Sequence, residues 1–271
     1  KILTSACGLR EIEEVFNKFS NGRDCVELEN VYAPGIDEKG RVKLFKVKKI
    51  YRLFVDKTFR LKFSNNSEIV VSSNQPFLTY RNGRIKWIRA EDLRIGDYIG
   101  VPAILPALNE EIEFKVPNYK YLRVIKEDNN FYYVKIFSTR TITKLPKRLT
   151  KEFAEFWGWF IADGNISKEE INIARKDENK RERIYELFKM FVENEKRIKS
   201  LKDRICIYST PLRKFLEEIF EMNLDRKSRK IRVPRFIFKT SLENIASFIK
   251  GLFEGDGYIG KHEIIYGSRS K

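Results

Sequence analysis

Two apolar runs with the same pattern constrain this chain more than any other feature. The first is residues 156–164 (Phe-Trp-Gly-Trp-Phe-Ile-Ala-Asp-Gly) and the second is residues 249–257 (Ile-Lys-Gly-Leu-Phe-Glu-Gly-Asp-Gly). Each has two small residues four positions apart and ends in Asp-Gly. Small residues at this spacing form a strip along a helix where another helix can approach closely. The sequence therefore predicts two helices packed strip to strip, with Asp163 and Asp256 together at their ends.

The flanking residues predict where these helices begin and end. Thr150 is a candidate N-cap, and Gly164 is expected to end the first helix in a left-handed turn. Thr240 and Glu243 have capping-box spacing before the second helix. Adjacent carboxylates repel, and divalent cations between them are the usual remedy. The alternative is two buried helices that happen to end in Asp-Gly.

The two runs resemble the paired motifs of LAGLIDADG homing endonucleases. The resemblance implies that Asp163 and Asp256 are catalytic and bind Mg²⁺ as cofactor, and that both strands of a DNA duplex are cut. It also implies a catalytic lysine near the centre of the site, for which Lys199 and Lys202 are the candidates. The chain departs from the family pattern at Trp157, Trp159 and Ile161.

The first third predicts an all-β module of short strands, turns and a hairpin at residues 81–84. Residues 87–97 have the spacing WxxAxxLxxGD, and residues 72–78 precede them. Both segments resemble the Hint fold of inteins and hedgehog proteins, which implies splicing-assist roles for Ser72 and Gln75. Gln75 stands where the family has histidine, and glutamine takes up no proton near neutral pH. For the nearby Cys7, the role of a small turn residue is favoured over that of the splicing nucleophile.

The resemblance gives an intein with an inserted nuclease, lacking both intein ends. Its fold class is an all-β Hint-like domain followed by an α+β LAGLIDADG domain, an αββαββα half whose second half is only begun. The expected domains are residues 1–102 for splicing, 103–147 as a basic β connector and 148–271 for the nuclease. The connector is either a plain linker hairpin or a DNA-recognition segment. The implied partners are double-stranded DNA, host protein exteins and a complementary C-terminal intein fragment.

Charge supports a polyanionic partner. The net charge is +16, and 54 basic residues are spread over the 271 positions, which favours nucleic acid without locating it. The DNA-binding candidates in the predicted sheet are Arg175, Lys176, Lys199, Lys202 and Arg204. The candidates in a following run without acidic residues are Arg226, Lys227, Arg229 and Lys230. A solvated basic face is the alternative for each group.

The cysteine and histidine content limits which kinds of site the chain can form. Three cysteines without CxxC spacing and a single histidine argue against a zinc site and a disulfide framework. We expect a cytoplasmic protein that does not enter a membrane. The alternatives to the nuclease are a maturase-like nucleic-acid-binding protein that does not cut, and a splicing element whose nuclease is degenerate.

Overall fold

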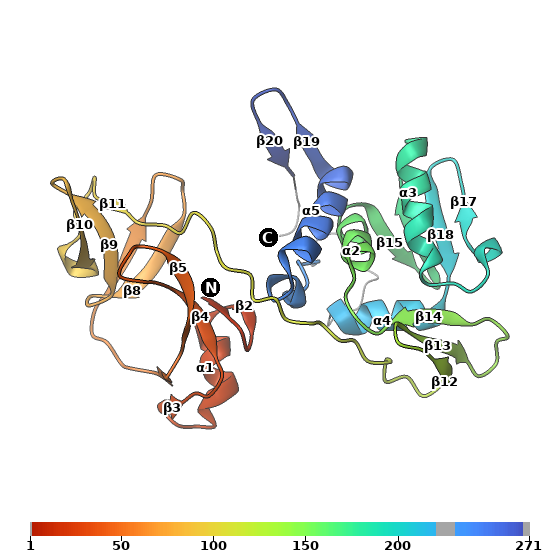
Figure 1. Ribbon diagram of the computed structural model, residues 1–271, viewed down its shortest axis with the longest axis horizontal. Helices are drawn as coiled ribbons and strands as arrows, with labels where there is room; N and C mark the ends of the chain where they lie inside the picture. The colour runs from red at the N-terminus through yellow and green to blue at the C-terminus, as the bar shows by residue number, and fades with distance from the viewer. Residues whose placement is uncertain (1, 221–230, 268–271) are drawn as a thin grey trace. The chain divides into compact units, whose positions relative to one another are not determined.

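The computed structural model describes residues 2–220 and 231–267 and shows a chain of two compact units, residues 1–106 and 107–271 (Figure 1). The predicted boundary at residue 102 lies four residues before the observed one. The predicted connector is no separate domain, because its strands pack into the core of the second unit.

The first unit is built mainly from paired antiparallel strands. Its pairs are β1 (Ile2–Thr4) with β2 (Gly8–Arg10), β3 (Cys25–Glu27) with β6 (Lys49–Tyr51), β4 (Tyr32–Ile36) with β5 (Val42–Lys46), and β7 (Thr58–Lys62) with β8 (Glu68–Ser72). A three-stranded sheet has the order β10 (Arg84–Arg89), β9 (Pro76–Arg81) and β11 (Tyr98–Ile99). Helix α1 covers Ile12–Ser20 and the turn η1 covers Ala90–Asp92. Asn82 and Gly83 both have positive φ, as the predicted two-residue hairpin requires.

The described residues of the second unit form a three-stranded sheet, a four-stranded sheet, a two-stranded hairpin and four α-helices. The three-stranded sheet has the order β12 (Leu122–Glu127), β13 (Phe131–Ile136) and β14 (Thr143–Pro146). The four-stranded sheet has the order β15 (Gly164–Ser167), β16 (Glu170–Ala174), β18 (Arg204–Tyr208) and β17 (Lys199–Ser200). The helices are α2 (Lys151–Asp163), α3 (Glu178–Lys189), α4 (Thr210–Phe220) and α5 (Leu242–Asp256), and the hairpin of β19 (Gly257–Ile259) and β20 (Ile264–Tyr266) follows α5. The short turns η2 and η4 cover Glu195–Arg197 and Arg235–Phe238.

Helices α2 and α5 lie side by side, as the two small-residue strips predict (Figure 1). A Cβ built on Gly158 would lie 2.1 Å from the carbonyl oxygen of Phe248, and one on Gly251 would lie 2.2 Å from that of Glu155. One on Gly255 would lie 2.2 Å from the Cβ of Ala162. No side chain fits at these distances, so glycine is required for the helices to touch through their backbones.

The aromatic face of α2 forms the core of the second unit. Phe153, Phe156, Trp157 and Phe160 are fully buried. The ring of Phe156 lies 4.7 Å from that of Phe191, and the ring of Trp157 lies 4.6 Å from that of Phe220. Such edge-to-face pairs add to the free energy gained by burial. Strands β13 and β14 join this core through Val134 and Leu145, which are also fully buried.

The ends of these helices confirm one predicted cap and correct two features. The Thr150 side chain accepts a hydrogen bond from the backbone N–H of Phe153, as expected. The N-cap of α5 is Ser241, which accepts from Asn244, whereas the predicted Thr240 is buried and accepts from the Asn244 side chain. Gly164 has φ −72° and ψ 149°, which is extended and not left-handed. Glycine is needed there because a Cβ would lie 2.4 Å from the Phe160 carbonyl oxygen.

Candidate nucleic-acid interface

The four-stranded sheet has one apolar and one polar face, because successive side chains on a strand point to opposite sides. The apolar face carries Ile166, Ile171, Ile173, Ile205 and Ile207, each at most 3% exposed. It belongs to the same core as three buried residues of α3: Ile184, Leu187 and Phe188. The register places Asn165, Asn172, Cys206 and Lys199 in one row on the opposite side. We call this side the polar face.

A small network of polar side chains occupies the middle of the polar face. Glu170 accepts hydrogen bonds from the Tyr208 hydroxyl at 2.6 Å and from the Asn172 amide at 2.8 Å. Its carboxylate also lies 3.4 Å from Nε of Arg204. The hydrogen bond to Glu170 raises the pKa of Tyr208, so this hydroxyl stays protonated at neutral pH. The Lys199 ammonium lies 4.8 Å from the centre of the Tyr208 ring.

The chemistry of this face suits a polyanion. Lys199 and Arg204 provide positive charge, and the carboxylate of Glu170 is engaged by its neighbours. Asn165, Ser167 and Tyr208 are exposed and provide hydrogen-bonding groups along the strands. The face can therefore contact phosphates through its cations and base edges through its polar side chains.

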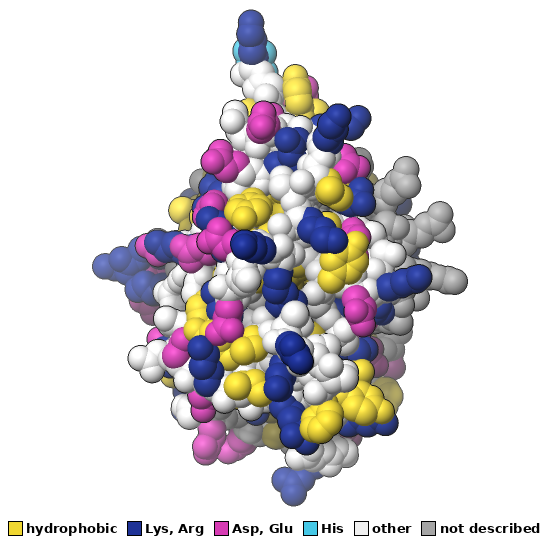
Figure 2. Space-filling view, turned by 90° about the vertical axis from the view of Figure 1, so that its right-hand side faces the viewer, with side chains coloured by type: hydrophobic (Ala, Val, Ile, Leu, Met, Phe, Trp, Pro, Cys, Tyr) yellow, Lys and Arg dark blue, Asp and Glu magenta, His cyan; other side chains and the backbone are white. Residues whose placement is uncertain are grey.

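The structure separates the predicted DNA-binding residues. Lys199 and Arg204 lie on the polar face, and Lys176 and Lys202 are exposed at the neighbouring strand ends. Arg181 donates hydrogen bonds to the backbone carbonyls of both Lys176 and Lys202, which holds these two strand ends together. Arg226, Lys227, Arg229 and Lys230 lie outside the described residues. In the space-filling view, basic side chains are spread among acidic and hydrophobic ones (Figure 2).

Arg175 lies elsewhere, at the end of the α2 and α5 pair. Its guanidinium is 3.1 Å from the Asp163 carboxylate, and it donates to the backbone carbonyls of Glu254 and Gly255. It also lies over the Trp159 ring at 5.4 Å. The predicted DNA contact is thus a link between strand β16 and the last turns of both helices.

The predicted metal residues lie at the same end of this pair. The contacts of Gly251 with Glu155 and of Gly255 with Ala162 show that the helices run in the same direction, so Asp163 and Asp256 end adjacent helices. Asp256 is exposed, whereas Asp163 is partly buried and paired with Arg175. Among the described residues, no three His, Cys, Asp or Glu side chains are grouped to hold a metal ion. No contact among the described residues tests the catalytic and metal-binding roles predicted for Asp163 and Asp256.

The predicted splicing-assist residues occupy the turn between β8 and β9. The Ser72 hydroxyl donates to the Asn74 side chain at 2.7 Å, and the Gln75 amide donates to the carbonyl of Pro76 at 3.3 Å. Gln75 is exposed, and its backbone carbonyl accepts from Ala90. The contacts of this turn are local and hold it against η1.

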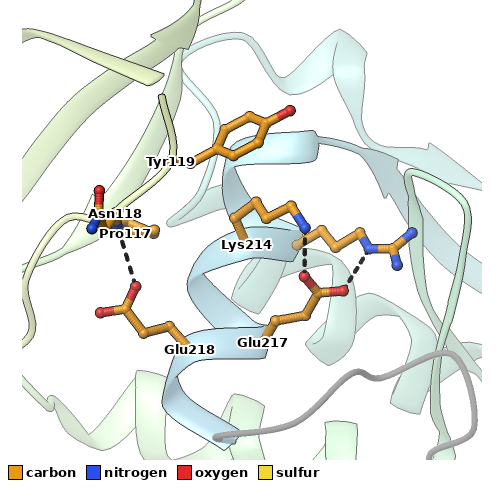
Figure 3. Close-up of a pocket in the computed structure, with 7 residues that line it drawn as sticks. Pro117, Asn118, Tyr119, Lys214, Glu217 and Glu218 are labelled. Atoms are coloured by element: carbon orange, nitrogen blue, oxygen red, sulfur yellow. Dashed lines mark hydrogen bonds and ion pairs between the residues drawn. The ribbon is translucent and has the colours of Figure 1, made fainter. Parts of the chain in front are cut away.

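A cavity of about 370 Å³ lies between residues 117–119 and α4 (Figure 3). Tyr119, Lys214, Glu217 and Glu218 are among its lining residues. Glu217 is paired with Lys214 at 2.9 Å and with Arg213 at 2.8 Å, and Glu218 accepts from the backbone of Asn118. These contacts tie residues 117–119 to the helix, so we assign the cavity a structural role.

Comparison with known proteins gives relatives that are much longer than the chain. No protein-family profile matches it. The chain is 29% identical over 269 residues to the replication factor C small subunit of Methanocaldococcus jannaschii, an alignment that covers 97% of the chain and 12% of that protein. It is 26% identical to the replication factor C small subunit of Thermococcus kodakarensis, with coverages of 97% and 26%. It is also 26% identical to the probable translation initiation factor IF-2 of M. jannaschii, with coverages of 96% and 26%.

These findings correct the family identification made from the sequence. The relatives are named as replication factor C small subunits and a translation initiation factor, and not as inteins or homing endonucleases. The intein and nuclease identification is therefore not upheld. Five expectations depended on this identification and are not upheld either: DNA cleavage, protein splicing, the maturase-like alternative, the Mg²⁺ cofactor and the intein partners. Among the described helices, none is both long and apolar enough to cross a membrane.

Proposed function

We propose that the second unit binds double-stranded DNA through the polar face of the four-stranded sheet. The observation that carries this proposal is the placement of Lys199 and Arg204 beside the buried Asn172 and Cys206 on a sheet face where the Glu170 carboxylate is already hydrogen-bonded. The proposal is one of binding and includes no cleavage step.

Physical considerations support duplex DNA as the ligand. The major groove is about 12 Å wide and admits strands, and several proteins read DNA with a sheet. The polar face combines cations for phosphates with amide and hydroxyl groups for base edges. A chain of net charge +16 is also attracted to a polyanion at long range.

The relatives add a limited argument. Two are named as replication factors, which supports DNA as the polyanion. Because the same segment also matches a protein named as a translation initiation factor, no activity particular to either is carried over. The match covers a minor part of each relative, so the remainder of those proteins says nothing about this chain.

The test is a salt titration of binding to a mixed-sequence duplex of about 30 base pairs. The double variant Lys199→Ala/Arg204→Ala should lower the slope of log K against log salt by about 1.8, since each phosphate contact contributes about 0.9. Lys189→Ala is the matched control, because Lys189 ends α3, whose buried residues pack on the apolar side of the sheet. Fluorescence anisotropy measures the affinity at each salt concentration, and the slope follows from these affinities.

Two results would refute the proposal. One is an unchanged slope and affinity for the double variant, with circular dichroism showing an intact fold. The other is a loss for Lys189→Ala of half the size seen in the double variant, since it removes one charge instead of two; this would mean that net charge alone drives binding. An intact slope in the control and a reduced slope in the double variant support the polar face.

A further inference from the structure

The three-stranded sheet of the second unit carries a second surface that the duplex-binding proposal does not use. Strand β13 alternates between its two faces. Val134 points into the core with Leu145 of β14, whereas Phe131 and Tyr133 point to the other side. Phe137 follows with the same parity and is 63% exposed. One face of this sheet therefore carries three aromatic rings, of which Phe137 is exposed and Phe131 and Tyr133 are half-buried.

Each of these rings is covered by a cation from a neighbouring strand. Arg123 lies 4.3 Å from the centre of the Phe137 ring, Lys126 lies 4.2 Å from that of Tyr133, and Lys144 lies 5.2 Å from that of Phe131. We call these three rings and three cations the aromatic-basic face.

The charge of this face favours an anionic ligand. Lys135 shares the parity of the rings and adds a fourth cation. Two carboxylates are engaged here: Asp128 accepts the Tyr133 hydroxyl at 2.8 Å, and Glu193 pairs with Lys126 at 3.0 Å. Four cations against two carboxylates leave the face positive. An acidic or apolar partner without phosphates would not use the rings and the cations together.

The spacing of the rings favours unpaired bases over a duplex. Side chains two residues apart on a strand are about 6.8 Å apart, so Phe131 and Tyr133 can each receive a separate base. A flat ring gains stacking energy only from a base that is not already stacked and paired within a duplex. Exposed aromatic residues beside cations are the features by which proteins hold single strands without sequence preference.

We propose that the aromatic-basic face binds single-stranded nucleic acid, with bases stacked on Phe131, Tyr133 and Phe137 and phosphates held by Arg123, Lys126 and Lys144. This site is separate from the polar face and does not depend on the duplex proposal. The cations exchange their ring contacts for phosphates, while the rings accept bases.

The test uses the full chain and fluorescein-labelled oligothymidylate of about 15 nucleotides, with oligouridylate of equal length as the RNA arm. Phe137→Ala should weaken binding to one or both by about 5- to 160-fold. Phe137 is largely exposed, so its truncation should leave the core intact. Tyr258→Ala is the matched control, because Tyr258 is a 60% exposed aromatic residue on β19.

A second variant gives a fluorescence signal that would not change if Phe137 had only a structural role. Phe137→Trp should retain affinity, and the additional tryptophan fluorescence relative to the wild type should be quenched when the oligonucleotide binds. Lys199→Ala/Arg204→Ala should leave single-strand binding unchanged, and Phe137→Ala should leave duplex binding unchanged, so failure of either proposal is recognisable alone.

Three outcomes would overturn the inference. The first is that neither oligonucleotide binds the wild type. The second is that Phe137→Ala binds like the wild type, or that Tyr258→Ala loses as much affinity. The third is an equal loss of duplex and single-strand affinity in Phe137→Ala, which would show that the face contacts the phosphate backbone without stacking.

Discussion

The close contact of α2 and α5 predicts that Gly158→Ala destabilises the second unit, although alanine is the better helix former. The new Cβ would lie 2.1 Å from the Phe248 carbonyl oxygen and 2.5 Å from the backbone nitrogen of Leu252. Both atoms belong to the backbone of α5, so no side-chain rotation relieves the clash. The two helices have to separate.

The loss of stability can be worked out from how far the two helices must separate. A carbon and a carbonyl oxygen in favourable contact lie about 3.3 Å apart, so the helices must separate locally by about 1.2 Å. Overpacking of this kind costs about 3 kcal/mol at the upper end of its usual range. The higher helix propensity of alanine offsets about 1 kcal/mol. The net loss of about 2 kcal/mol corresponds to a fall in Tm of about 4–8 °C.

Near-ultraviolet circular dichroism during urea or thermal unfolding measures this change, because Trp157 and Trp159 are buried beside the contact. Ala246→Gly is the control. Ala246 is exposed on α5, so this change measures only the difference in helix propensity between alanine and glycine, which is about 1 kcal/mol. If Gly158→Ala proves as stable as the wild type or more stable, propensity outweighs the clash and the close backbone contact is wrong.

Two further predictions concern ion pairs. Burial by itself would raise the pKa of Glu155, but hydrogen bonds from Arg183 and Lys250 outweigh it and hold the pKa below 4.5. Glu155→Gln should therefore lower the free energy of unfolding by about 1–2 kcal/mol at neutral pH, a cost that the exposure of Arg183 reduces. In urea unfolding, the difference in stability between this variant and the wild type should shrink as the pH falls below 4.5. Hydrogen bonds from Arg81, and then from the Arg94 backbone, hold the pKa of Asp97 at about 2, so this pair stabilises the first unit above pH 3.8 and the stabilisation is lost as the pH falls toward 2. Asp97→Asn should remove that part of the pH dependence in thermal unfolding followed by Trp87 fluorescence, and an unchanged pH profile would contradict the pairing.

Much of the second unit could be predicted from local sequence because its elements are specified locally. Glycine and alanine four residues apart identify a helix contact whatever surrounds it, and the structure shows the contact. The sequence predicts the cap of α5 one residue early because Thr240 and Ser241 are both good caps, and the burial of Thr240 decides between them. The sequence predicts a connector at residues 103–147 because no sequence pattern shows which core Val134 and Leu145 enter.

The candidate interfaces were harder to predict. The alternation of Ile171, Asn172 and Ile173 indicates a strand with one polar face, but it does not show that Glu170 and Tyr208 meet across β16 and β18. The cation and ring pairs on β12–β14 also depend on the register between strands. Their signal in the sequence is the spacing of Phe131, Tyr133 and Lys135, which predicts a shared face without saying whether it is buried.

Strand β16 explains both the success and the failure of the predictions around it. Glu170, Asn172 and Ala174 point to the polar face, whereas Ile171 and Ile173 point to the core. Arg175 continues the second series just beyond the strand, so its charge goes to Asp163 and to the last carbonyls of α5 instead of to the polar face. A basic residue is therefore assigned by its parity on the strand and not by its proximity to other basic residues. Because one short strand carries the polar face on one side and holds the helix pair on the other, a ligand that displaces β16 would also move Arg175 and the end of α5.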